Sequence, residues 1–153
     1  MTDSDLTKIS QVQLVYRRKI KANDRPKIRK SEDAFALFRE NWNDLTINLF
    51  EEFKVMLIDR NNRCMGISTI AMGGVSGLYV DNKIIFGLAL KARACNLILA
   101  HNHPSGNLTP SKADIRLTEH ICKAGELLDI NVLDHIILTD EGYVSFSKEG
   151  LIL

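Results

Sequence analysis

Long apolar stretches are missing from this chain. Its 153 residues contain no run of about 18 apolar residues, the length that a membrane-spanning helix needs. The first residues, Met1 to Asp5, also lack the basic and apolar parts of a secretory signal peptide. We therefore expect a cytoplasmic protein that does not enter a membrane.

A large excess of charge is absent as well. The 20 Lys and Arg residues face 19 Asp and Glu residues, which leaves a formal net charge of +1. Such a balance gives no strong field to steer polyanions toward the protein. Basic residues are concentrated between Arg17 and Lys30. They could form a phosphate-facing patch or a solvated segment, and we favour the solvated segment because no aromatic residues lie among them. Binding of nucleic acid is thus weakly supported.

Cysteine is scarce. Cys64, Cys95 and Cys122 are odd in number, widely spaced and set among apolar residues. This pattern fits neither a disulfide framework nor a cysteine-type zinc site. We interpret the three as reduced packing residues.

The composition that is present, 45% apolar and 25% charged residues, is that of an ordinary globular protein. No internal repeat or linker divides the chain, so one core suffices at this length. We assign residues 1–49 to an N-terminal extension, a strand plus a helix packed on the core, and residues 50–153 to the main domain.

Hydrophobic periodicity predicts an α/β fold, a mixed β-sheet with helices on its faces. Residues 1–10 look frayed. Strands are expected at 11–20, 53–59, 64–71, 96–100, 131–138 and 142–146. Helices are expected after a cap at Ser31, at 82–94 and at 112–128. Their expected buried faces are Ala34, Phe35, Phe38 and Trp42; Ile84, Ile85, Leu88 and Ala92; and Leu117, Ile121, Ala124 and Leu128.

Two histidines follow the short apolar strand at 96–100. His101 and His103 are two residues apart, so at a strand end their side chains leave the same face and can converge on one metal ion. Asp114 lies at the start of the next helix, where the intervening loop can fold it back as an oxygen ligand. Two imidazoles and one carboxylate leave a fourth position for water, as in catalytic zinc sites.

A plainer interpretation exists for part of this pattern. Ser111 and Asp114 have the spacing of a capping box, which by itself explains both residues at a helix start. A lone His-x-His pair is also a weak signal. The combination of the pair with Asn102, a Pro-Ser-Gly turn, Ser111 and Asp114 is what favours metal binding.

This combination resembles the JAMM signature of zinc metallopeptidases, the JAB/MPN domain. More narrowly, the stretches His101-Asn102-His103-Pro104-Ser105-Gly106, Pro110-Ser111, Asp114-Ile115 and Leu133-Asp134-His135-Ile136-Ile137 resemble the RadC family of bacterial proteins. The likeness extends from about residue 50 to residue 151. It implies a cytidine-deaminase-like mixed sheet with helices on its faces.

The resemblance also implies roles for individual residues. His101, His103 and Asp114 would be ligands of Zn²⁺, and Ser111 would donate to the developing oxyanion. The general base of the family is a glutamate in a Glu-Phe pair, which maps onto Glu52. If Glu52 reaches the zinc-bound water, Glu51 should point away, because neighbouring strand residues face opposite sides. The two other histidines considered, His120 and His135, are left outside the site, His135 as a core imidazole.

Two functions compete. The first is hydrolysis of a peptide, isopeptide or related amide, with such an amide as the substrate partner. The second is a DNA repair or recombination accessory role of the RadC type, in which the zinc site is retained but hydrolysis is not essential. A cytidine deaminase is disfavoured, because the His-x-Glu and Pro-Cys-x-x-Cys signatures are absent.

Overall fold

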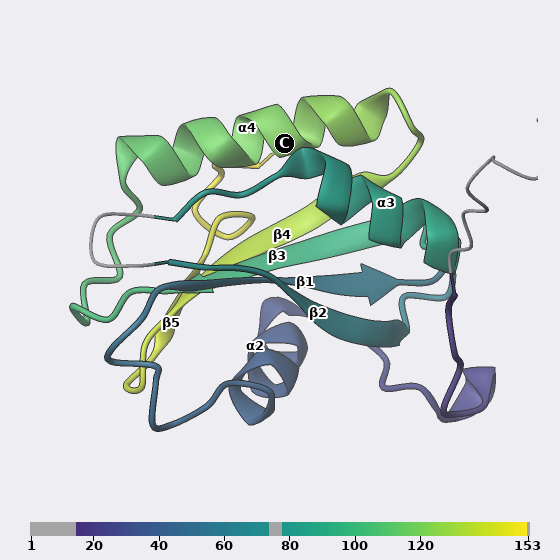
Figure 1. Cartoon of the computed structure of the whole chain (residues 1–153), viewed down its shortest axis with the longest axis horizontal. Helices are drawn as coiled ribbons and strands as arrows, with labels where there is room; N and C mark the ends of the chain where they lie inside the picture. Colours follow the sequence, from purple (N-terminus) through teal and green to yellow (C-terminus); the bar gives the residue numbers. More distant parts are fainter. Residues whose placement is uncertain (1–14, 74–77, 153) are drawn as a thin grey trace, which may run out of the picture.

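The computed structural model describes residues 15–73 and 78–152. Its centre is a five-stranded sheet in the order β2-β1-β3-β4-β5 (Figure 1). The strands are β1 (Glu52–Ile58), β2 (Cys64–Met72), β3 (Asn96–Asn102), β4 (Asn131–Leu138) and β5 (Tyr143–Ser145). β1 runs antiparallel to β2 and β3, β3 runs parallel to β4, and β4 runs antiparallel to β5. The predicted mixed sheet is confirmed.

Helices cover both faces of this sheet (Figure 1). Helix α2 (Ser31–Glu40) lies on one face, whereas α3 (Asn82–Ala92) and α4 (Lys112–Glu126) lie on the other; a short 3-10 turn, η1, spans Ala22–Asp24. Each face buries its own apolar cluster, one around Phe53, Leu99 and Ile121, the other around Phe38, Met56 and Ile136. Among the described residues, no helix has the length and apolar character to cross a membrane.

The predicted strand at 11–20 is wrong over the part that the structure describes. Residues 15–20 form no strand, while residues 1–14, which include the segment expected to be frayed, lie outside the described residues. Tyr16, the described member of the alternating apolar residues Val12, Leu14 and Tyr16 that predicted the strand, is 38% exposed, and Val15 and Ile20 beside it are 70% and 45% exposed. Further along the sequence, Lys27 forms an isolated antiparallel bridge with Arg63, the residue just before β2.

Helix α2 is present, and Ala34, Phe38 and Trp42 are buried as expected. Its predicted cap is wrong, however. Lys30 is the N-cap and makes no side-chain capping bond, whereas the Ser31 hydroxyl donates to Asp134 Oδ2 at 2.9 Å. The serine instead joins the helix to the sheet.

The two later helices also differ in detail from the prediction. In α3 the buried side chains are Ile85, Phe86, Ala89 and Ala92. Ile84 and Leu88, which were expected to be buried, are 48% and 36% exposed. This part of the prediction failed because α3 has apolar residues on nearly all sides, so periodicity does not show which face is covered. Helix α4 ends at Glu126, before Leu128, which is 41% exposed.

Candidate metal centre

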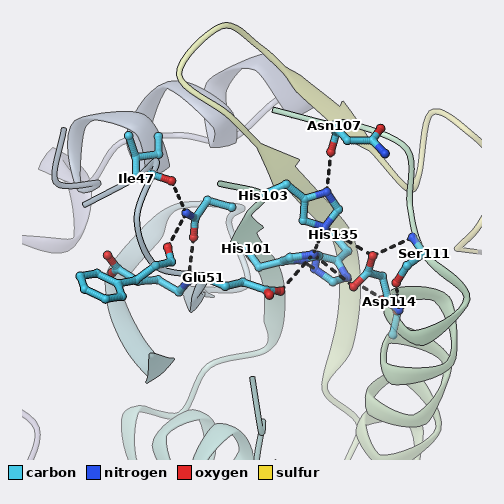
Figure 2. A network of polar contacts seen from close by, with 12 residues as sticks. Ile47, Glu51, His101, His103, Asn107, Ser111, Asp114 and His135 are labelled. Carbon is cyan, nitrogen blue, oxygen red and sulfur yellow. Dashed lines mark hydrogen bonds and ion pairs between the residues drawn. The ribbon is translucent and has the colours of Figure 1, made fainter. Parts of the chain in front are cut away.

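Four polar side chains converge at one end of the sheet. His101 and His103 come from the carboxyl end of β3, Asp114 from the first turn of α4, and Glu51 from the residue just before β1. One ligand atom from each lies within 4.8 Å of every other. Figure 2 shows Asp114 and Glu51 approaching His101 from opposite sides. The structure therefore brings together the three residues predicted as ligands and adds Glu51.

The spacing of the three predicted ligands suits a metal ion. The Nε2 atoms of His101 and His103 are 3.0 Å apart, and they lie 3.3 Å and 3.5 Å from Asp114 Oδ1 and Oδ2, respectively. In a tetrahedral zinc site, with ligand distances of about 2.1 Å, neighbouring ligand atoms are about 3.4 Å apart. Two imidazoles and one carboxylate form a donor set that fits zinc and related divalent ions. Their role as ligands remains a prediction.

His103 is held with its Nε2 atom toward the cluster. Its Nδ1–H donates to the backbone carbonyl of Asn107, which can only accept (Figure 2). This bond places the ring hydrogen on Nδ1. In the metal-free protein, the hydrogen bond to Asp114 raises the pKa of His103, against the lowering effect of burial.

Asp114 is fixed by the helix start. Ser111 Oγ accepts from the Asp114 backbone N–H at 3.0 Å, and Asp114 Oδ2 accepts from the Ser111 N–H at 2.7 Å, which completes the capping box. Burial raises the pKa of Asp114, but in the metal-free protein the hydrogen bonds that His101 and His103 donate when protonated outweigh it and hold that pKa well below its usual range. The capping interpretation and the metal interpretation are thus compatible, because one carboxylate takes part in both arrangements.

The prediction that Glu52 faces the site is wrong, and Glu51 takes that place. Phe53 pairs directly with His101 across β1 and β3, so both side chains lie on the same face of the sheet. Alternation then sends Glu51 to this face, with Oε1 4.0 Å from His101 Nε2, and Glu52 to the other. Glu52 is buried there between Thr46 Oγ1 at 3.1 Å and Lys54 Nζ at 3.2 Å.

Asn102 holds the segment that carries Glu51. This residue, which lies between His101 and His103 in the sequence, is fully buried. Its Nδ2 donates to the backbone carbonyls of Ile47 and Phe50 at 2.6 and 2.7 Å. Its Oδ1 accepts from the Glu52 N–H at 2.7 Å. The side-chain amide therefore fixes the backbone on both sides of Glu51.

His135 is the residue that the sequence reasoning left out. It is fully buried on β4, and its Nε2 lies 2.8 Å from His101 Nδ1 (Figure 2). Burial lowers the pKa of His135 well below its ordinary value, and the neighbouring His101 adds to this effect. The interpretation as a buried imidazole was correct. Its contact with the cluster depends on the parallel pairing of β3 with β4, which the sequence did not reveal.

A cavity of about 510 Å³ opens over the cluster. Glu51, His101, His103, Ser111 and Asp114 line it on the polar side. Its apolar walls are Phe53, Leu78, Tyr79, Val80, Ala113 and Leu117. The arrangement has room for a small organic group beside the imidazoles. His120, by contrast, is exposed on α4, outside the cluster.

Together, the sheet, the helices on its faces and the His-His-Asp cluster define an α/β domain with a candidate metal centre at a strand end. A family model described as "RadC-like JAB domain" matches residues 28–151, and the chain belongs to this family. The match includes α2, which lies in the segment that we assigned to an N-terminal extension.

Curated relatives agree with this family. The chain is 42% identical over 125 residues to a UPF0758 protein of Flavobacterium johnsoniae, covering 82% of this chain and 53% of the relative. It is 39% identical over 131 residues to a UPF0758 protein of Desulforamulus reducens, covering 86% and 56%. A UPF0758 protein of Porphyromonas gingivalis is 36% identical over 136 residues, covering 88% and 60%. The chain thus spans little more than half the length of these relatives.

Proposed function

We propose that this domain is a zinc-dependent hydrolase that cleaves a peptide, isopeptide or related amide bond. The observation that carries the proposal is the convergence of His101, His103, Asp114 and Glu51 on one point at the floor of a cavity. Three of them have ligand spacing. The fourth, Glu51, is a carboxylate at the distance of a proton acceptor, about one water molecule away.

The donor arrangement argues for a cation at this point. When Nδ1 of His103 carries the ring hydrogen, its Nε2 presents a lone pair to the cluster. His101 Nε2 and the Asp114 carboxylate face the same space, 3.0 Å and 3.5 Å from His103 Nε2. Electron-rich atoms at such distances repel unless a positive charge, a proton or a metal ion, lies among them. When bound by these residues, a zinc ion would supply that charge, and it would lower the pKa of a water molecule to about 7 and polarise a carbonyl oxygen.

We infer that Glu51 would move the proton. Its side chain is 33% exposed and lines the cavity, while its backbone is held by the hydrogen bond from the Gly73 N–H to its carbonyl at 2.7 Å. It would take a proton from the attacking water and return it to the leaving amine.

We infer that Ser111 would stabilise the tetrahedral oxyanion. It lines the cavity, and accepting one bond from Asp114 leaves its hydroxyl hydrogen for donation.

The cavity walls favour an apolar substrate group. Leu78, Tyr79, Val80 and Leu117 stand beside the cluster, and the charged residues that line the cavity are those of the cluster itself. An amide whose flanking side chain is aliphatic or aromatic would bury apolar area against them, at about 25 cal/mol per Å². We therefore expect apolar amides to be better substrates than acidic or basic ones.

A hydrolysis screen tests this function. The zinc-loaded full chain is incubated with peptides, isopeptides and small amides whose residue beside the scissile bond is apolar, acidic or basic. We expect cleavage of an apolar member, loss of cleavage on chelation, and a fall of about 10²- to 10³-fold in Ser111→Ala. Protein that carries one zinc ion but cleaves no member of the screen would contradict the proposed hydrolysis.

A further inference from the structure

A chain of hydrogen bonds runs inward from His101 through the core. His101 Nδ1 meets His135 Nε2 at 2.8 Å, and His135 Nδ1 meets Thr118 Oγ1 at 2.6 Å. Thr118 Oγ1 in turn donates to the backbone carbonyl of Asp114 at 2.7 Å. The three side chains that form these hydrogen bonds, those of His101, His135 and Thr118, are buried, so water does not compete for the bonds. The direction of each hydrogen bond is therefore set by its neighbours.

The Asp114 carbonyl decides the first direction. A carbonyl oxygen can only accept, so Thr118 must use its single hydroxyl hydrogen on it, as residues four apart on a helix allow. The same hydroxyl then has only lone pairs left for its second partner. The hydrogen between Thr118 and His135 must consequently belong to His135 Nδ1.

The remaining directions follow in turn. A neutral imidazole with its hydrogen on Nδ1 has a lone pair on Nε2, so His135 accepts from His101. A neutral His101 ring therefore carries its one hydrogen on Nδ1 and turns the lone pair of Nε2 toward His103 and Asp114. The His135 ring cannot easily turn, because the rings of Phe53 and Phe146 pack against it at 5.6 and 4.7 Å between centroids.

We propose that Thr118 and His135 are positioning residues that fix His101 in the tautomer needed to bind a metal ion. The inference rests on the proposed metal centre and deepens it. His103 obtains the same tautomer from a backbone carbonyl, that of Asn107. The tautomer of His101 is also set by a backbone carbonyl, that of Asp114, but through the side chains of Thr118 and His135. One predicted ligand thus orients another through the core.

Nuclear magnetic resonance of the histidine rings tests the proton order without requiring activity or metal. In the metal-free full chain, ¹⁵N shifts distinguish the ring nitrogen that bears hydrogen from the one with a lone pair. We expect Nδ1–H in His135. In Thr118→Val, which keeps the shape but removes the hydroxyl, we expect the Nε2–H form to become populated, and Thr118→Ser should restore the parent pattern. An Nε2–H tautomer in the parent would overturn the proposal.

Zinc affinity tests the consequence. Thr118→Val and His135→Phe should bind zinc about 10- to 100-fold more weakly than the parent, the usual effect of losing a group that orients a ligand. Thr118→Ser should bind like the parent. Ile121→Val is the matched control, because it removes buried volume from the same helix but no polar group.

The outcomes separate the two proposals. Unchanged affinity in Thr118→Val and His135→Phe would overturn the positioning role while leaving the metal centre intact. A parent that shows Nδ1–H in His135 but binds no zinc would overturn the proposed function while leaving the proton order standing.

Discussion

Exchanging each of two adjacent glutamates for glutamine gives opposite expectations. Glu51 faces His101 at 4.0 Å and is 33% exposed, whereas Glu52 lies on the other face and is 5% exposed. Glu51→Gln keeps the shape and removes the proton acceptor. A general base contributes about 10² to 10⁴ in rate, which corresponds to about 3 to 5 kcal/mol of the activation free energy. Turnover of the zinc-loaded protein should fall by that factor, with zinc content unchanged.

Glu52→Gln should instead lower stability. It leaves the buried ammonium of Lys54 without its carboxylate, although Nζ keeps its bond to the Asn41 carbonyl at 3.0 Å. Breaking a buried ion pair costs about 3 to 5 kcal/mol, and the remaining bond argues for the lower end. About 3 kcal/mol corresponds to a fall in Tm of about 6 to 12 °C for a domain of this size.

Thermal unfolding and initial rates, measured on the same preparations, separate the two effects. Rates are compared per folded, zinc-loaded molecule, so that loss of stability in Glu52→Gln does not count as loss of chemistry. Full turnover in Glu51→Gln, or a rate loss in Glu52→Gln as large as that of Glu51→Gln, would refute the assignment of the base from the strand register.

Three further predictions concern the surroundings of the site. Asn102→Ala should lower the free energy of unfolding by about 2 to 4 kcal/mol in urea titrations, because it leaves the buried Glu52 N–H and two carbonyls without partners. The pKa of His135 is lowered in the folded, metal-free protein, so the unfolded chain binds a proton first as the pH falls below about 6.5. The free energy of unfolding therefore decreases by up to about 1.4 kcal/mol per pH unit in this range. His135→Phe should lack this acid limb in denaturant titrations at pH 7, 6 and 5, and an identical limb in both proteins would contradict it. Duplex DNA should bind weakly, without sequence preference and less at higher salt, because the net charge is +1; tight, selective binding at physiological salt would instead favour the accessory role.

The sequence predicted the parts of the site that depend on local spacing. His101 and His103 share a face because they are two apart on a strand, and Ser111 and Asp114 meet because a capping box brings them together. These relationships need no knowledge of the tertiary structure. The same is true of most strands, whose apolar runs and turn residues bound them along the chain.

The parts that depend on register could not be predicted. Which glutamate faces the cluster is decided by the pairing of Phe53 with His101, and a shift by one residue would exchange Glu51 and Glu52. Contact between His135 and His101 likewise needs the parallel register of β3 and β4. In α3, apolar residues on nearly all sides left the covered face undecided until the helix was placed on the sheet.

The most direct test of the account is a zinc titration of the metal-free full chain. We expect one zinc ion per chain, and loss of tight binding in His101→Ala, His103→Ala and Asp114→Ala, because each removes one of three converging ligand atoms. His120→Ala, which changes an exposed histidine outside the cluster, should bind like the parent. If the three ligand variants bind zinc as tightly as the parent, the cluster is not a metal centre.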